Sequence, residues 1–394
     1  MYHVFCYVLL IKIVIILSCI AYIKLKQPFW SIQPVFHAYD LHYFVYNPQV
    51  LINELPETNK FVNFKNIKSK TFASIDTKSC KEITEFIRNN YLKEKDCRFL
   101  PEKSNILPYF TATQTQSIWS VYYESANVQN KIEISTEIKI AGFISSRPMK
   151  VKMKDIVLSV CYVDYLCVDK FKRKKGIAPQ LIQTHNYNQR RMNKETKVCL
   201  FKREQELTGI VPIVAYTTYG FCMKSWEKPL CLRINYNKLQ ITPTNFFFFW
   251  NFLKTCAYHF DVFATCEAHS LLSLIKSDNV FIYVVIINDV MKSAYFYRKS
   301  CTFIEENLEA VSCFASINNG LSDDVFVHAF KETLWDICDK KRFAYAVIEN
   351  ISHTETIIKS LLKRNEAEIQ SPTAYFFYNY IHATVKASKS IFIC

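Results

Sequence analysis

Runs typical of strands and of helices alternate along this chain of 394 residues, and the alternation limits its fold more than any other feature. In the first half, a helix is expected at 81–92 and strands at 138–145 and 156–168. A polar helix at 180–192 and a strand at 210–216 follow. The second half repeats the pattern with helices at 246–259, 324–337 and 354–363 and strands at 280–287, 294–297, 343–348 and 374–380. Such alternation predicts an α/β (mixed α+β) protein of two similar domains with twisted mixed sheets flanked by helices.

Glycine is scarce in this chain, and its scarcity excludes two common nucleotide sites. The five glycines are Gly142, Gly176, Gly209, Gly220 and Gly320. A dinucleotide-binding fingerprint and a Walker loop each need several glycines close together. The chain is therefore expected to bind neither a dinucleotide nor a nucleoside triphosphate in those ways.

The net charge of +14 favours an anionic partner. Nucleic acid, a membrane surface and a CoA ligand all fit that charge, and so does an AT-rich genome that encodes Lys and Asn throughout. No nucleic-acid reader motif or concentrated basic helix is present, so we expect no nucleic-acid partner.

The 15 cysteines and nine histidines lack the spacing of metal ligands, so no metal site is expected. Scattered cysteines among apolar residues are typical of a reducing compartment, which predicts a cytoplasmic protein.

The first residues form the longest apolar run in the chain. Residues 4–23 hold one charge, Lys12, and are long enough to cross a bilayer, with Lys24 and Lys26 directly after them. As an anchor, this segment would keep the rest of the chain on the cytosolic face. A helix on a lipid surface, a helix packed in the core and a wrongly assigned start codon are the alternatives.

A strand, a basic loop and a helix start follow one another at residues 164–179. Five cations precede the expected first turn: Lys170, Lys172, Arg173, Lys174 and Lys175. Free N–H groups at a helix N-terminus bind phosphate, and Pro179 suits a first turn because its missing N–H would have no partner there. From these residues alone, a pyrophosphate site and a solvated basic loop fit equally well.

Several motifs in this chain resemble those of the N-myristoyltransferases. Residues 166–182, LCVDKFKRKKGIAPQLI, are similar to the family pattern of L-C-V-H-K, a basic loop and L-A-P-x-L-I. Gly142-Phe143-Ile144-Ser145 with Pro148 resembles G-F-I-S-x-x-P, and residues 29–35 match F-W-x-x-Q-P-V. Asn90-Tyr91 with Arg98-Phe99, Tyr216-Thr217, and Asn235 with Lys238-Leu239 resemble further elements. The resemblance runs from about residue 29 to the C-terminus and is thinner in the second half.

The resemblance implies two fused acetyltransferase-like domains and an acyltransferase activity. We expect an apolar segment at 1–27, an acyl-CoA-binding domain at 28–225, and a peptide-binding domain at 226–394 that carries a catalytic C-terminus. The implied reaction moves a myristoyl group from myristoyl-CoA to the N-terminal glycine amine of proteins. Myristoyl-CoA would be a co-substrate with no permanently bound cofactor, and the chain is expected to be a monomer.

The resemblance also assigns site residues. Backbone N–H groups of Tyr165 and Leu166 would form an oxyanion hole, and preorganised donors of this kind contribute about 3 kcal/mol each. The C-terminal carboxylate of Cys394 would be the general base. The acyl-CoA contacts would come from Phe29, Trp30, Leu166, Cys167, Val168, Lys172, Arg173, Lys174, Lys175, Gly176, Ile177 and Ala178. Asp164, Thr217 and Tyr91 would bind the peptide substrate.

Two departures from the family pattern keep other functions open. Asp164 replaces the family's Asn, and residues 363–369 lack all three glycines of the family's K-F-G-x-G-D-G signature. The main alternative is therefore a catalytically weakened acyl-CoA-binding or lipid-binding protein on the same fold. An acetyltransferase acting on lysine or small amines is a further alternative, which the F-W-x-x-Q-P-V element disfavours.

Overall fold

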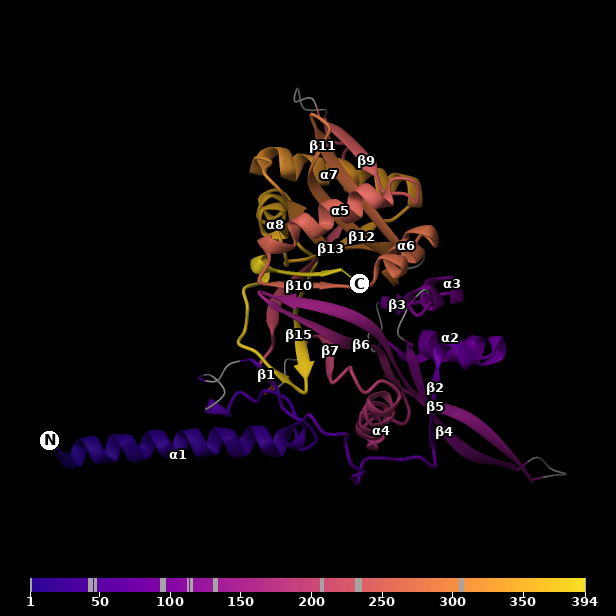
Figure 1. Ribbon diagram of the computed structural model, residues 1–394, viewed down its shortest axis with the longest axis vertical. Coiled ribbons are helices and arrows are strands. Elements are labelled where there is room, and N and C mark those ends of the chain that lie inside the picture. The colour runs from indigo at the N-terminus through magenta and orange to yellow at the C-terminus, as the bar shows by residue number, and fades with distance from the viewer. Residues whose placement is uncertain are drawn as a thin grey trace.

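One twisted sheet runs through both halves of the molecule in the computed structural model (Figure 1). The structure describes residues 2–41, 45, 48–92, 97–111, 113, 116–129, 134–205, 209–230, 236–304 and 308–393. Within them, fifteen strands follow the order β17-β10-β5-β6-β7-β15-β8-β14-β13-β12-β11-β9, with β4 joining β5, β2 joining β4 and β3 joining β12. The sheet mixes parallel and antiparallel pairs, as the sequence predicts.

The first half supplies seven of these strands, namely β2 (Ile67–Thr71), β3 (Cys97–Phe99), β4 (Ile118–Gln129), β5 (Ile134–Met153), β6 (Ile156–Val168), β7 (Val198–Glu204) and β8 (Val214–Cys222). The second half supplies β9 (Asn237–Gln240), β10 (Val262–Thr265), β11 (Val280–Ile287), β12 (Val290–Ile304), β13 (Leu308–Asn318), β14 (Tyr345–Glu349), β15 (Ile369–Tyr378) and β17 (Ser390–Ile393). A separate two-stranded pair joins β1 (Gln49–Val50) to β16 (Tyr380–Ile381).

The helices are α1 (Tyr2–Lys26), α2 (Thr77–Asn90), α3 (Lys103–Ile106), α4 (Ile177–Met192), α5 (Phe246–Cys256), α6 (Ala268–Lys276), α7 (Asp323–Lys341) and α8 (Thr354–Leu362). Short 3-10 turns are η1 (Trp30–Ile32), η3 (Phe72–Ser74), η4 (Leu107–Tyr109), η5 (Ala257–His259) and η6 (Ala387–Lys389). Helices thus flank a mixed sheet, and the predicted fold class is confirmed.

Helices cover both faces of the sheet in the second half, because alternate residues of its strands point to opposite faces. On β12, Tyr295 and Tyr297 pack with α7 and α8, while Ala294 and Phe296 pack with α5 and α6. Helix α5 contributes only one of its faces to this core. Phe246 and Phe249 are buried, but Phe247 and Phe248 are 69% and 67% exposed.

The end of the chain completes the sheet of the first half. Strand β15 lies between β7 and β8, and β17 pairs with β10, which in turn pairs with β5. Helix α4 packs closely on β5 at Gly142, where an added Cβ would lie 2.7 Å from a Leu181 methyl carbon. The domain boundaries at 28–225 and 226–394 stay predictions.

Several predicted elements have the observed bounds and others do not. The strands at 156–168 and 280–287 match β6 and β11. The strand predicted at 210–216 is wrong in its bounds, since β8 begins at Val214 and Ile210 makes only an isolated bridge to His37. Strands β4, β7 and β13 are absent from the prediction. Polar residues interrupt the apolar runs of β4 and β13, and β7 has only four apolar residues before Lys202.

Helix α1 extends away from the body, with the N-terminus at its far end (Figure 1). It contains a stretch, Val4–Lys26, long and apolar enough to cross a membrane, and none of that window is buried. Its C-terminal end contacts η1.

Candidate active site

Strands β6 and β7 separate in the middle of the sheet. They pair in parallel from Val160–Val198 to Val163–Phe201. Beyond that point β6 continues against β5 while β7 continues against β15. Asp164 and Lys202, the next residues on the two strands, therefore have no shared ladder. We call this place the splay.

A β-bulge lies at the splay. The pairing of β5 with β6 passes from Phe143–Cys167 to Ser145–Asp164, so Tyr165 and Leu166 together oppose Ile144 alone. Tyr165 has a φ of 49°, in the left-handed region that side chains rarely adopt. A bulge takes backbone groups out of the regular ladder and re-aims them. Adjacent N–H groups at such a point suit a site where negative charge develops.

Asp164, directly before the bulge, forms an ion pair with Arg147 of β5. Arg147 Nε lies 2.6 Å from Asp164 Oδ2, and the two side chains are 4% and 19% exposed. The rings of Tyr109 and Tyr162 lie 5.2 and 4.9 Å from the Arg147 guanidinium carbon. Burial raises the pKa of Asp164, while Arg147 and then Arg298 act in the opposite direction. The Asp164 carboxylate is therefore already paired with Arg147, and this pairing makes it a less suitable base for a substrate proton.

Three side chains from three strands meet Glu349 of β14 on the same face of the sheet. Glu349 is 2% exposed, and its Oε1 lies 3.0 Å from Lys202 Nζ and 2.6 Å from Arg298 Nη2. The Tyr216 hydroxyl donates to Oε2 of Glu349. Burial alone would raise the pKa of Glu349, but Lys202, Arg298 and the Tyr216 hydrogen bond bring it below its ordinary value. Lys202 also lies 3.0 Å from Glu204 Oε1, so its ammonium is held at the splay.

The basic loop before α4 uses part of its charge to hold its own shape. Lys172 pairs with Glu124, and Arg173 Nη2 donates to the Asn90 carbonyl at 2.6 Å. Lys174 and Lys175 are exposed, and no ion pair of theirs is found among the described residues. Gly176 then turns the chain with a φ of 77° into the first turn of α4, which holds Ile177 and Ala178. Two free cations beside a helix N-terminus make a suitable place for phosphate.

The residues at 29–33 dock onto the sheet next to the splay. The Trp30 ring stacks on Phe201 at 5.6 Å, and Phe201 is the last residue of β7 that pairs with β6. Phe29 packs edge-on against Trp30 and against Phe61. This places Phe29 and Trp30, two of the predicted acyl-CoA contacts, close to the splay.

Two of the three predicted peptide-binding residues lie together. The Tyr91 ring packs edge-on against the Tyr165 ring at 5.6 Å, next to Asp164. Thr217 lies elsewhere: β8 meets β7 only through β15, and Thr217 points to the face opposite to Tyr216. The residue across the splay from Asp164 is Lys202, which the sequence analysis does not select. The sequence signal that could have identified Lys202 is its position in the strand that follows helix α4.

The chain end lies on the face that carries Lys202. Phe392 stacks on Tyr375 at 3.8 Å between ring centroids, and Tyr375 is the register partner of Lys202. Ile391, Phe392 and Ile393 are all buried. Cys394, predicted to supply the base, lies outside the described residues.

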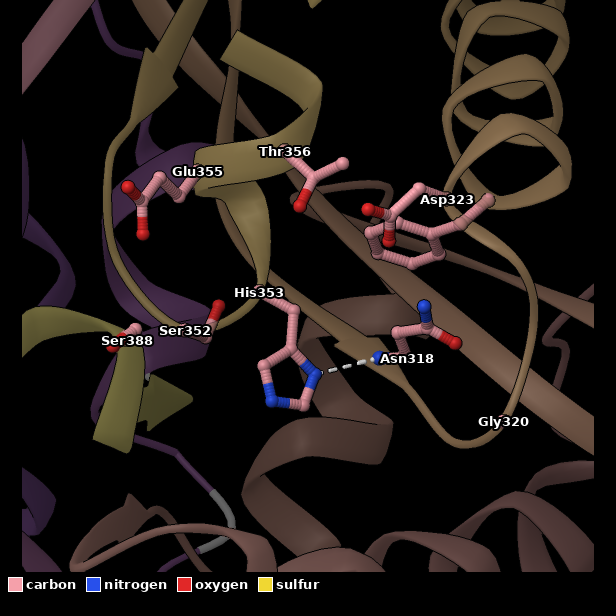
Figure 2. Close-up of a pocket in the computed structure, with 9 residues that line it drawn as sticks. Asn318, Gly320, Asp323, Ser352, His353, Glu355, Thr356 and Ser388 are labelled. Carbon is pink, nitrogen blue, oxygen red and sulfur yellow. Dashed lines mark hydrogen bonds between the residues drawn. The ribbon is translucent and has the colours of Figure 1, made fainter. Parts of the chain in front are cut away.

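An open cavity of about 300 Å³ lies away from the splay, between the starts of α7 and α8 (Figure 2). His353 in its wall accepts a hydrogen bond from the Asn318 N–H at 2.8 Å. Burial, with a smaller effect of His259 and Lys389, lowers the pKa of His353 to about 4. None of the predicted site residues lines this cavity, so the splay remains the candidate active site.

Comparison with known proteins shows that the bulge of β6 lies in a segment that matches a known domain. Residues 53–199 match the family described as "Myristoyl-CoA:protein N-myristoyltransferase, N-terminal domain". This segment contains β5, the bulge of β6, the basic loop and α4. This segment of the chain is therefore similar to the N-terminal domain of the N-myristoyltransferases. The predicted family resemblance is confirmed.

Relatives in this family match part of the chain. Glycylpeptide N-tetradecanoyltransferase of Drosophila melanogaster is 30% identical over 171 residues, which are 40% of this chain and 32% of the fly protein. Glycylpeptide N-tetradecanoyltransferase 1 of Arabidopsis thaliana is 26% identical over 108 residues, 26% of this chain and 22% of the plant protein. The matching stretch thus spans about a third or less of each relative.

The fold extends the likeness over nearly the whole chain. A crystal structure of Saccharomyces cerevisiae N-myristoyltransferase with bound myristoyl-CoA has a TM-score of 0.69 at 12% identity, covering 91% of this chain and 94% of the yeast chain. A second structure of the yeast protein gives 0.71 at 12% identity, with 92% and 91% covered. The N-myristoyltransferase fold, with its acetyltransferase-like domains, is therefore present beyond residue 199.

Proposed function

We propose that this chain transfers a myristoyl group from myristoyl-CoA to the N-terminal glycine amine of a protein. The observation that carries the proposal is the bulge at Tyr165 and Leu166, which lies at the splay and inside the family-matching segment. The amine nitrogen attacks the thioester carbonyl carbon, and the carbon–sulfur bond breaks. The acceptor amine loses a proton to a base, and the CoA thiolate leaves and is protonated.

The two N–H groups of the bulge stabilise the oxygen of the tetrahedral intermediate. They are fixed by the pairing of β5 with β6 before the substrate binds, so little reorganisation is needed when charge develops. Phe29 and Trp30 pack against the CoA, and the first turn of α4 binds its phosphates with Lys174 and Lys175. Arg173 acts indirectly, since its guanidinium holds the loop against α2.

The C-terminal carboxylate of Cys394 takes the proton of the amine in this proposal. Buried Ile391, Phe392 and Ile393 hold the chain end in an apolar setting, and desolvation of a carboxylate and an amine brings their pKa values closer together. Asp164 is the less suitable base, because Arg147 already pairs with its carboxylate. Tyr91 and Asp164 form the wall beside the amine.

A second function is favoured by one observation. Arg147 and Lys202 bring two cations to the acceptor end of the splay, where a substrate ammonium would be repelled unless Asp164, Glu204 and Glu349 offset them. If these three carboxylates do not offset the two cations, the substrate amine is not bound. The chain is then a weakened acyl-CoA-binding protein on the same fold.

Labelled myristoyl-CoA mixed with the full chain and matched peptides that begin with Gly or with Ala separates the two functions. We expect label on the Gly peptide alone. Tight acyl-CoA binding with no label on any peptide would replace the proposal by the binding function. Absence of acyl-CoA binding would overturn both.

A further inference from the structure

Helix α1 is apolar all around and exposed along almost its whole length. It has 25 residues, which at about 1.5 Å each span roughly 37 Å, more than the ~30 Å hydrocarbon core of a bilayer. Val4, Leu10 and Leu17 are 66%, 59% and 60% exposed. A helix that is hydrophobic on every side is stable only when protein or lipid covers it.

Lys12 is the only charged residue between Tyr2 and Ile23. Insertion of one lysine near a helix centre is unfavourable, but thirteen Val, Leu, Ile and Phe residues at 4–23 outweigh it on the same scale. Lipid is therefore a sufficient cover for this helix.

The junction between α1 and the body is short and packed. The Gln27 N–H donates to the Ile23 carbonyl at 3.0 Å, and the Ser31 N–H donates to the Gln27 carbonyl at 3.1 Å. Ile23 packs against Gly209, where an added Cβ would lie 2.6 Å from its Cγ2 atom. Lys24 Nζ lies 5.1 Å from the centre of the Tyr39 ring. No extended linker separates the helix from the body.

Around this junction lie residue types that favour a membrane–water interface. Tyr22 is 62% exposed with the Lys26 ammonium 5.7 Å from its ring centre. On the body, Ile32 and Leu41 are 60% and 66% exposed, in segments that adjoin the helix end. Aromatic rings, lysines and exposed aliphatic side chains together are typical of the headgroup level.

We propose that α1 inserts into a lipid bilayer and that its packed junction holds the acyl-CoA entrance at the lipid surface. Phe29 and Trp30 follow the helix within four residues, and Trp30 stacks on Phe201 at the splay. Long acyl chains partition into bilayers, so an entrance at that surface meets acyl-CoA already concentrated there. The entrance part of this inference rests on the proposed function, while the insertion of α1 does not.

Flotation of the full chain, purified in detergent and mixed with phosphatidylcholine vesicles with and without phosphatidylserine, tests the insertion. We expect the chain to float with both vesicle types, and Ile13→Glu with Ile16→Glu to lower the bound fraction at least about tenfold. Val157→Glu, at an exposed apolar position on β6, is the matched control and should still float. A wild-type chain that stays unbound would overturn the insertion, as would detergent-free self-association that leaves vesicles untouched.

The entrance is tested by the rate at which fluorescent myristoyl-CoA moves from vesicles to the protein, a readout that needs no turnover. A flexible Gly-Ser insertion between Lys26 and Gln27 should leave flotation intact and slow this rate several-fold. The same variant should bind acyl-CoA normally in detergent micelles. An unchanged rate from vesicles would overturn the entrance. Loss of acyl-CoA binding by wild-type chain in micelles would instead overturn the proposed function and leave the flotation result standing.

Discussion

Arg147 Nε lies 2.6 Å from Asp164 Oδ2, directly before the bulge that is the centre of the candidate site. Asp164 stands where the N-myristoyltransferase pattern that the chain resembles has asparagine. The buried Arg147 lies on the neighbouring strand, and the charges of Arg147 and Asp164 offset each other. The pair also makes Asp164 a structural part of the site before any role with a substrate.

Replacing Asp164 should therefore destabilise the chain. Asp164→Asn removes the carboxylate that faces a nearly fully buried guanidinium, and we expect a loss of roughly 3 kcal/mol in the free energy of unfolding. The double variant Arg147→Met with Asp164→Asn should recover much of that loss. Urea unfolding of the wild type, both single variants and the double variant measures the coupling. Additive losses would mean that the two groups do not stabilise each other.

Glu349 should matter for stability through its two cations. Glu349→Gln leaves Lys202 and Arg298 without their shared carboxylate, and we expect a loss of about 3 kcal/mol. Because the pKa of Glu349 is lowered in the folded state, its contribution is present above about pH 4.5 and is lost as the pH falls below that value. The free energy of unfolding should differ less between pH 7 and pH 4 for Glu349→Gln than for the wild type. Glu355→Gln, an exposed acid on α8, is the control.

His185 should make the chain sensitive to mild acid. The imidazole is buried between the Ser120 and Ser146 hydroxyls, each at 2.8 Å, and burial lowers its pKa from 6.5 to about 4. His185 in the unfolded chain therefore takes up a proton at a higher pH than His185 in the folded chain. The free energy of unfolding falls as the pH drops from about 6.5 towards 4. At pH 5 the loss should be roughly 2 kcal/mol. His185→Gln should flatten this part of the pH profile and His382→Gln, at an exposed position, should not.

Lys174 and Lys175 should bind the CoA phosphates more than Lys172 and Arg173 do. Lys174→Ala with Lys175→Ala should weaken myristoyl-CoA binding on the order of tenfold at low salt and less at high salt. Lys194→Ala with Lys340→Ala, at exposed positions elsewhere, is the matched control. Binding measured by calorimetry at two salt concentrations decides this, and equal affinities for both double variants would remove the phosphate site from the loop.

The backbone carboxylate at the C-terminus should serve as the base whatever the side chain of the last residue is. Deleting Cys394 moves the carboxylate by one residue, and we expect turnover to fall on the order of a hundredfold while acyl-CoA affinity stays the same. Cys394→Ser keeps the carboxylate in place and should turn over normally. If the deleted chain keeps full turnover, another group takes the proton.

Local patterns predicted the fold class, the strands at 156–168 and 280–287 and the loop that precedes α4, because each depends on a short stretch of sequence. The polar contacts of the site were beyond such patterns. Arg147 meets Asp164 across a strand pair, and Glu349 meets Lys202 from a strand that is 147 positions away in the chain. Thr217 was selected by motif, whereas the course of β7 brings Lys202 to the splay. Contacts of this kind depend on strand order, which the sequence pattern does not contain.

A structure of the full chain with a myristoyl-CoA analogue, in which a methylene separates the carbonyl from the sulfur, tests the central claim most directly. The proposed function predicts the carbonyl oxygen within about 3 Å of the Tyr165 and Leu166 nitrogens, with the phosphates at Lys174, Lys175 and the first turn of α4. An analogue bound with its carbonyl away from the bulge, or with its phosphates away from this loop, would contradict it.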